Sequence, residues 1–273
     1  MKDWSPKNFR YHEEDGVAVL RLDRPERLNS LTFECYRELA STFADLQERR
    51  SVRSVLLTGT GRAFCSGGDV GEIIGPLLKM DGEELLAFTR LASSLVRNIC
   101  MLRKPVIAGL NGTTCGAGAV IALAADFRVA SRSARIAFLF TKVGLCGADM
   151  GAAYLLPRVV GHGHATDLLM RGHFITADEA HRIGLYTQVV DDAELMDSAT
   201  ALARELADGP RFGLSMTKEM LYREMSMSLE QALEAEAQAQ AICMRDQDYR
   251  EAHQAFLEKR KPDFRRIREN ASG

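Results

Sequence analysis

Hydrophobic residues along the chain follow two spacings, one typical of strands and one typical of helices. Branched aliphatic residues fill the short runs 17–22 and 54–58, as expected of buried strands. Between these runs, apolar residues from Phe33 to Leu46 recur every three or four positions and predict a helix. A strand–helix–strand order predicts a parallel sheet with crossover helices.

The pattern continues through the middle of the chain. Asp81 and Glu84 resemble a capping box, and the apolar face that follows predicts a second helix up to about Ile99. Residues 106–108 predict the next strand, and the almost wholly apolar stretch 117–125 predicts a helix that is buried on all sides. Further strands are expected at Phe127–Ala130 and Gln188–Val190, and further helices around 151–156 and 177–182.

From about residue 193 the pattern is entirely helical. Gly209-Pro210 interrupts it once, and Ser228 starts a long helix that reaches about Ala241. The composition also changes near residue 205. We therefore expect two regions, an α/β core over residues 1–205 and a helical C-terminal region over residues 206–273.

Composition and charge exclude several classes of protein. With 35 basic and 37 acidic residues among 273, the chain has no excess charge to attract nucleic acid or an anionic membrane. The six cysteines have no metal-ligand spacing, so we expect reduced thiols and no metal site. The N-terminus has no apolar export signal, and no segment is long enough to span a membrane. These features predict a cytoplasmic globular protein.

Two glycine-rich turns stand out, and each follows a predicted strand. The first covers residues 59–69, and the second covers residues 111–118 and leads into the buried helix. Neither matches a phosphate-binding loop or a dinucleotide-binding motif. Glycine allows close backbone approach to a ligand, and free N–H groups at a helix start favour negative charge. The pair suits a two-donor oxyanion hole, although each turn alone could be simple turn chemistry.

These turns belong to motifs that resemble a known family. The chain contains, in order, the segments RAFCSGGDV, NGTTCGAGAVIALAADFRVAS, GADMGAAYLLPRVVG and AFLEKRKPDF. Together they resemble the crotonase (enoyl-CoA hydratase/isomerase) family over nearly the whole chain. The resemblance implies a spiral ββα core, a helical trimerisation region, and a homotrimer or a hexamer built as a dimer of trimers. It also implies an acyl-CoA substrate and no separate cofactor, since coenzyme A is part of the substrate.

The resemblance assigns roles to individual residues. The oxyanion donors of the family match the backbone N–H groups of Gly68 and Ala117. Two fixed donors would stabilise an enolate or a tetrahedral oxyanion on the thioester carbonyl. Phe256 and Lys259 of the C-terminal helix are expected to reach the ligand of a neighbouring subunit. The other expected contacts with the acyl-CoA are Arg27, Leu28, Ala63, Ser66, Gly67, Asp69 and Phe140.

The chain departs from the hydratase pattern where carboxylates are expected. Val120 and Phe140 align with the two glutamates that act as acid and base in the standard hydratase. Asp149 is the carboxylate that remains in the neighbouring turn, and it could act as a general base or nucleophile. Alternatively, Asp149 could be the N-cap of the helix that starts near Gly151.

Other candidates are more typical of structure than of chemistry. Asp69 is expected to order its turn, and Cys65 and Cys115 are expected to be small packed thiols. His162 and His164 are more typical of a surface turn than of a metal pair.

We therefore expect an acyl-CoA-processing enzyme of the hydratase/isomerase type. The alternatives are an acyl- or aryl-CoA thioester hydrolase of the same family and a non-catalytic CoA-binding relative.

Overall fold

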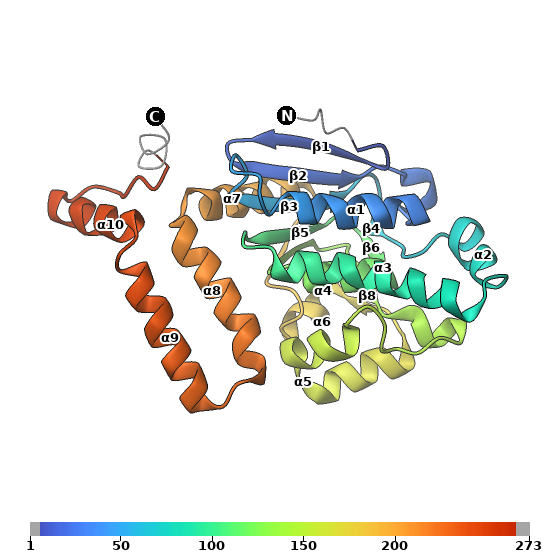
Figure 1. Ribbon diagram of the computed structural model, residues 1–273. Coiled ribbons are helices and arrows are strands. Elements are labelled where there is room, and N and C mark those ends of the chain that lie inside the picture. Colours follow the sequence, from blue (N-terminus) through green and yellow to red (C-terminus); the bar gives the residue numbers. More distant parts are fainter. Residues whose placement is uncertain (1–5, 266–273) are drawn as a thin grey trace.

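Six strands form the larger of two sheets in the computed structural model, which describes residues 6–265 (Figure 1). In sheet order these are β1 (Phe9–Glu14), β2 (Val17–Leu22), β3 (Ser54–Gly59), β5 (Val106–Leu110), β7 (Phe127–Ser131) and β10 (Gln188–Val190). The pairs from β2 to β10 are parallel, whereas β1 and β2 form an antiparallel hairpin. The expected parallel sheet is confirmed.

Four short strands form the second sheet. Its order is β4 (Ala63–Cys65), β6 (Thr113–Cys115), β8 (Arg135–Ala137) and β9 (Ile175–Thr176). β4 directly follows β3, β6 follows β5, and β8 follows β7. Each turn of the chain therefore adds one strand to each sheet before a helix returns it, which confirms the predicted spiral ββα fold.

Helices cover the sheets and complete each turn of the spiral. Within the α/β part they are α1 (Phe33–Asp45), α2 (Gly75–Leu77), α3 (Gly82–Met101), α4 (Ala117–Ala124), α5 (Ala152–Arg171), α6 (Ala177–Arg182) and α7 (Leu195–Asp208). The predicted capping box is confirmed, because Asp81 accepts from the Glu84 backbone and Glu84 accepts from the Asp81 backbone. All eight residues of α4 are buried, as predicted.

The larger sheet contributes to two hydrophobic cores, one on each face. Along β2, Ala18, Leu20 and Leu22 join the main core, whereas Val17 and Val19 pack on the opposite side. This division follows from the strand, in which successive side chains point to opposite faces. Small alanines of α7 cover the second face and allow the helix to approach closely.

Three helices follow α7, and the last two of them extend away from the core, as Figure 1 shows. They are α8 (Arg211–Arg223), α9 (Leu229–Cys243) and α10 (Gln247–Glu258). Many apolar side chains of these helices and their connections are exposed in the single chain: Leu221, Met225, Leu229, Leu233, Ile242, Met244, Tyr249, Phe256 and Leu257. The division between residues 205 and 206 stays a prediction. This position lies inside α7, which packs on the larger sheet.

Three features of the fold were not predicted or were predicted incompletely. The strand β1 and the short strands of the second sheet were missed. β4 and β6 lie within the glycine-rich turns, and β8 and β9 are only three and two residues long. The helix expected around 151–156 continues to Arg171, with a kink at Gly161. Over residues 6–265, no helix is both long enough and apolar enough to cross a membrane.

A buried lysine joins α8 to the core. The ammonium of Lys218 lies 2.7 Å from a carboxylate oxygen of Asp126 and 3.1 Å from the carbonyl oxygens of Ile99 and Lys104. The same Asp126 oxygen accepts from the backbone N–H of Val106 at 2.7 Å. A single charged network therefore ties α8 to the end of α3 and the start of β5.

We predict that Lys218→Met lowers the free energy of unfolding by about 3 kcal/mol, because Asp126 is left as a buried charge without its partner. Urea denaturation measures this change. Arg171→Ala is the matched control, since the Arg171–Asp167 pair is exposed and its loss should cost less than about 1 kcal/mol. Equal effects of the two substitutions would contradict the anchoring role of Lys218.

Candidate active site

The two glycine-rich turns meet at adjacent strands of the smaller sheet. β4 and β6 are parallel neighbours, with Ala63 opposite Thr113 and Cys65 opposite Thr114. The chain leaves both strands on the same side, so the segment after Cys65 lies beside the segment after Cys115. A Cβ placed on Gly67 would lie 3.1 Å from the carbonyl oxygen of Cys115 and 3.3 Å from the backbone nitrogen of Ala117. The structure therefore brings the two predicted turns into direct backbone contact.

Each turn presents a backbone N–H without an internal partner. Leu31 pairs with the first turn by donating to the Gly67 carbonyl at 2.8 Å and accepting from the Asp69 N–H at 2.9 Å. In a parallel bridge of this kind, the N–H of the central residue, Gly68, points away from Leu31. Ala117 is the first residue of α4, so its N–H precedes the helical ladder. Within residues 6–265, neither N–H has a hydrogen-bond acceptor.

Glycine is required where the turns touch. A Cβ on Gly118 would lie 2.4 Å from the carbonyl oxygen of Cys65, which is far inside contact distance. Gly67 and Gly116 adopt φ values of +93° and +57°, a region that side chains rarely allow. The absence of side chains at these positions sets the separation of the two turns.

Two asparagines hold the first turn in place. The amide of Asn29 donates to the carbonyl oxygens of Thr60 and Ala63, and that of Asn111 donates to Gly61 and Ala63. Ala63 is 1% exposed, and its carbonyl already accepts both amides. The expected contact of Ala63 with the ligand stays a prediction, although its carbonyl is already occupied by these two amides.

Asp69 orders its turn, as the structural interpretation of this residue predicted. Its carboxylate accepts from the hydroxyl of Ser30 at 2.8 Å and from the backbone N–H groups of Gly71 and Glu72 at 3.0 and 3.1 Å. These bonds, the one from Ser30 foremost, lower the pKa of Asp69. Asp69 is thus a structural anion that has few free lone pairs for a ligand.

Asp149 lies in the turn before α5 and does not cap that helix. The N-cap position of α5 is Gly151, and no side chain caps it. Asp149 instead accepts only from the neighbouring N–H of Met150, at 2.9 Å. Partial burial raises the pKa of Asp149, since a single hydrogen bond compensates little of the lost hydration. The N-cap interpretation is wrong, and the carboxylate has no ion-pair partner among the described residues.

Tyr36 of α1 is buried within electrostatic range of Asp149. Burial raises the pKa of the Tyr36 phenol well above its usual value, and the charge of Asp149 raises it further. Val120 of α4 is fully buried and Phe140 is nearly so.

Other reactive side chains do not form a second centre. Cys65 and Cys115 are buried, and burial raises the pKa of both thiols, that of Cys115 to about 11. Neither is a ready nucleophile, as expected. His162 and His164 are exposed but lie within α5, just after its kink, rather than in a surface turn. No cluster of metal ligands occurs in the part of the chain that the structure describes.

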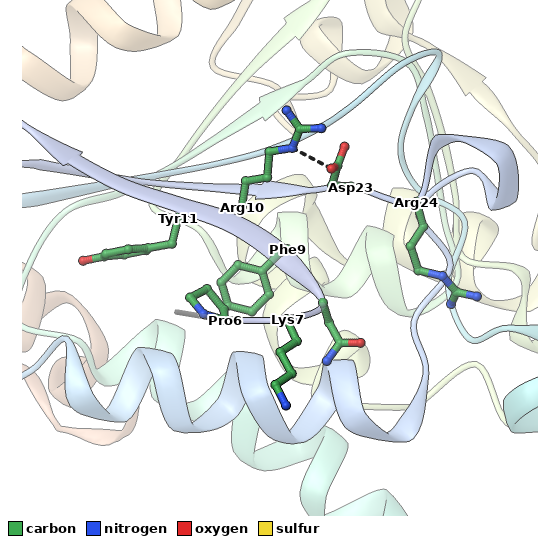
Figure 2. Close-up of a pocket in the computed structure, with 8 residues that line it drawn as sticks. Pro6, Lys7, Phe9, Arg10, Tyr11, Asp23 and Arg24 are labelled. Atoms are coloured by element: carbon green, nitrogen blue, oxygen red, sulfur yellow. Dashed lines mark hydrogen bonds and ion pairs between the residues drawn. The ribbon is translucent and has the colours of Figure 1, made fainter. Parts of the chain in front are cut away.

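Figure 2 shows a separate pocket of about 440 Å³ at the start of β1. Lys7, Arg10 and Arg24 make it basic. Its carboxylate, Asp23, lies 2.6 Å from Arg10, and this bond lowers the pKa of Asp23. The pocket therefore has no group suited to accept a proton near neutral pH, and the glycine turns remain the candidate site.

Comparisons with known proteins identify the family of this chain. A family model described as enoyl-CoA hydratase/isomerase matches residues 12–267. The chain belongs to this family.

Among its relatives is the 1,2-epoxyphenylacetyl-CoA isomerase of Escherichia coli (strain K12), which is 40% identical over 257 residues, 93% of this chain and 96% of the relative. A crystal structure of a "putative enoyl-CoA hydratase" from Streptomyces coelicolor A3(2) is 52% identical, with a TM-score of 0.94. That structure covers 96% of this chain, and this chain covers 95% of it. The fold of the family, with its C-terminal helices, is therefore that of this protein.

The remaining predicted contacts fall into two groups. Arg27 is exposed, and Ser66 donates to the carbonyl of Leu28, so these residues border the first glycine turn. Phe256 and Lys259 lie at the end of α10, which Figure 1 places on the opposite side of the molecule from α2, the helix that follows the first turn. These two residues do not reach the glycine turns of their own chain. Their expected contact with the ligand of another subunit stays a prediction.

Three residues near the site were not predicted. They are Asn29 and Asn111, whose amides hold the first turn, and the buried Tyr36. The asparagines could have been noticed, since a side-chain amide beside a glycine turn often bonds to the backbone. Nothing in the spacing of Tyr36 indicates that its phenol lies near Asp149.

We predict that Gly118→Ala lowers the free energy of unfolding by about 1–3 kcal/mol, because the new methyl group overlaps the Cys65 carbonyl and forces the turns apart. Thermal and urea denaturation measure the change. Gly163→Ala is the matched control, since a Cβ there meets no atom within 4 Å and alanine favours the helix. If Gly118→Ala were as stable as Gly163→Ala, the close contact of the turns would not constrain the site.

Proposed function

We propose that the protein is an acyl-CoA isomerase that moves a proton on its substrate through an enolate. The observation that carries this proposal is the pair of unpartnered N–H groups, Gly68 and Ala117, at the contact of the two glycine turns. A thioester carbonyl oxygen between them would receive two hydrogen bonds as it gains negative charge. Preorganised donors of this kind stabilise the transition state by several kcal/mol.

Asp149 is the proposed base. Removing a proton from the carbon next to the thioester carbonyl places the electron pair on the carbonyl oxygen as an enolate. The carboxyl group of Asp149, now protonated, returns the proton to a different carbon, so the product is an isomer. Its raised pKa suits a group that must both accept and release a proton.

The apolar side chains of Val120 and Phe140 favour isomerisation over hydration as the reaction. Val120 and Phe140 take the places that the hydratase pattern gives to two glutamates, so no carboxylate at those positions would activate water. A single carboxylate is sufficient to move one proton. The name of the Escherichia coli relative, 1,2-epoxyphenylacetyl-CoA isomerase, supports an isomerase and makes that thioester the first substrate to test. A CoA thioester hydrolase is the second candidate, because the same two donors also suit a tetrahedral oxyanion.

The reaction is tested with a panel of epoxyarylacetyl-, enoyl- and aryl-CoA thioesters. Mass spectrometry separates the outcomes, since isomerisation leaves the mass unchanged, hydration adds water, and hydrolysis releases free CoA thiol. We expect an isomer of unchanged mass. Turnover of none of the thioesters, together with no thermal stabilisation by them, would overturn the proposal, because any ligand that binds the native state raises its melting temperature.

We predict that Asp149→Asn lowers kcat by about 10²-fold or more, the scale of general-base contributions. Asparagine can still accept from Met150, so the affinity for CoA should not change. Steady-state kinetics measure both quantities. Asp167→Asn is the control, since Asp167 is an exposed carboxylate in a surface pair. Near-normal turnover by Asp149→Asn would remove Asp149 from the mechanism.

The pH dependence gives an independent check of the same prediction. Only ionised Asp149 can accept a proton, so turnover should fall as the pH decreases through its raised pKa. A raised carboxyl pKa means that the folded state favours the protonated form, so stability is lost as the pH rises from the unfolded-state pKa of Asp149 through its raised folded-state pKa. Asp149→Asn should therefore be at least as stable as the wild type at neutral pH. A less stable variant would indicate a structural role instead.

A homotrimer or a dimer of trimers is the proposed assembly. Helices α8–α10 expose a large set of apolar side chains in the single chain, and exposed patches of this kind usually mark interfaces. In such an assembly, Phe256 and Lys259 could approach the ligand of a neighbour. We expect light scattering to give a trimer or a hexamer at micromolar concentration, and a monomer would contradict the assembly.

A further inference from the structure

The C-terminal end of α4 is held by a buried arginine. This helix begins at Ala117, whose N–H faces the candidate site, and its last carbonyl groups lie in the interior, where water cannot reach them. Arg128, in strand β7, is only 5% exposed. One of its terminal nitrogens donates to the carbonyl oxygens of Ala125 at 2.5 Å and Leu123 at 3.2 Å. The guanidinium therefore caps the end of α4 that lies opposite Ala117.

The charge at this end of α4 is positive overall. The Nε of Arg128 donates to the carbonyl of Leu185 at 2.6 Å, so this guanidinium nitrogen also binds a neutral acceptor. The carboxylate with an electrostatic effect on Arg128 is Asp126, which already binds Lys218 at 2.7 Å. Two cations and one carboxylate thus form the buried cluster. An excess of positive charge results whether or not Asp126 is ionised.

A cation at the C-terminus of a helix changes the field at its N-terminus. The backbone dipoles of a helix are equivalent to about +0.5 charge at the first residues and about −0.5 at the last. A positive cluster at the last residues of α4 offsets the negative end of the helix dipole. The positive end of the dipole at Ala117 then acts on the site with less opposition from the negative end. A helix of eight residues is about 12 Å long. At that distance, with an effective dielectric constant of about 20, a unit charge changes the rate of a step that forms an anion by roughly tenfold.

We propose that Arg128 is a positioning residue that fixes α4 and strengthens the anion-stabilising field at the Ala117 N–H. This inference rests on the proposed function, in which a thioester oxyanion forms at Ala117. Arg128 touches no reacting atom and acts only through the helix. Because the cap and the charge come from the same guanidinium, the experiment must separate the two contributions.

The test uses two substitutions of Arg128 and a spectroscopic readout. Cinnamoyl-CoA bound to the protein reports polarisation of its carbonyl, since a stronger field at the carbonyl oxygen shifts its ultraviolet absorption to longer wavelength. Arg128→Gln removes the charge but keeps donor groups, and Arg128→Lys keeps the charge with fewer donors. We expect Arg128→Gln to reduce the shift and to lower kcat about tenfold, with CoA affinity unchanged. Arg128→Lys should retain most of both.

Asp126→Asn is the matched variant that changes the charge in the opposite direction. It removes the negative member of the cluster and leaves Arg128 in place, so we expect a spectral shift at least as large as that of the wild type. A purely structural role of the cluster predicts a reduced shift in Asp126→Asn as well as in Arg128→Gln. Should Arg128→Gln fail to fold, Arg128→Lys and Asp126→Asn still decide between charge and structure.

The outcomes also separate this inference from the proposed function. A wild-type protein that binds cinnamoyl-CoA without any shift would overturn the oxyanion site, and the role of Arg128 with it. A shift in the wild type that stays undiminished in Arg128→Gln would overturn the role of Arg128 alone. A reduced shift in Asp126→Asn would do the same.

Discussion

The close contact of two backbone turns is the constraint on which the rest of the structure depends. Gly118 lies so near the Cys65 carbonyl that no side chain fits between them, and the backbone at Gly67 lies in contact with that of Cys115 and Ala117. This contact sets the start of α4 and the pairing of β4 with β6. Because backbone atoms occupy these positions, the site offers N–H groups at a fixed separation and no reactive side chain of its own.

A site made of backbone must obtain its selectivity from the residues around it. Asn29, Asn111 and Asp69 use their polar atoms to hold the first turn and have little capacity left for a ligand. The proposed base, Asp149, lies in the turn before α5, and the proposed CoA contacts, Phe256 and Lys259, lie at the end of α10. These residues do not hold the glycine turns in place. Because different residues hold the turns and act on the ligand, a carboxylate beside the turns could change without altering the two backbone N–H groups.

The sequence predicted the repeated features of the fold and missed those that depend on tertiary contact. Hydrophobic spacing located β2, β3 and α3, because each has an unbroken apolar face or run. It missed β4 and β6, whose three residues are too short for any periodicity and exist only because the turns pair. The proposed donors Gly68 and Ala117 could be named from motifs, but the close approach of their two turns could not. Spacing also does not show that the carbonyl of Ala63 is already occupied by two amides.

Asp69 and Asp149 show why a residue type in a motif does not determine its role. Hydrogen bonds from Ser30 and from two backbone N–H groups lower the pKa of Asp69, so its negative charge is already stabilised. Burial raises the pKa of Asp149, and one bond from Met150 offsets only part of that effect. Environments that separate the pKa values of two carboxylates typically assign them different tasks. The carboxylate with fewer partners is the one that gains most from accepting a proton, which supports Asp149 rather than Asp69 as the base.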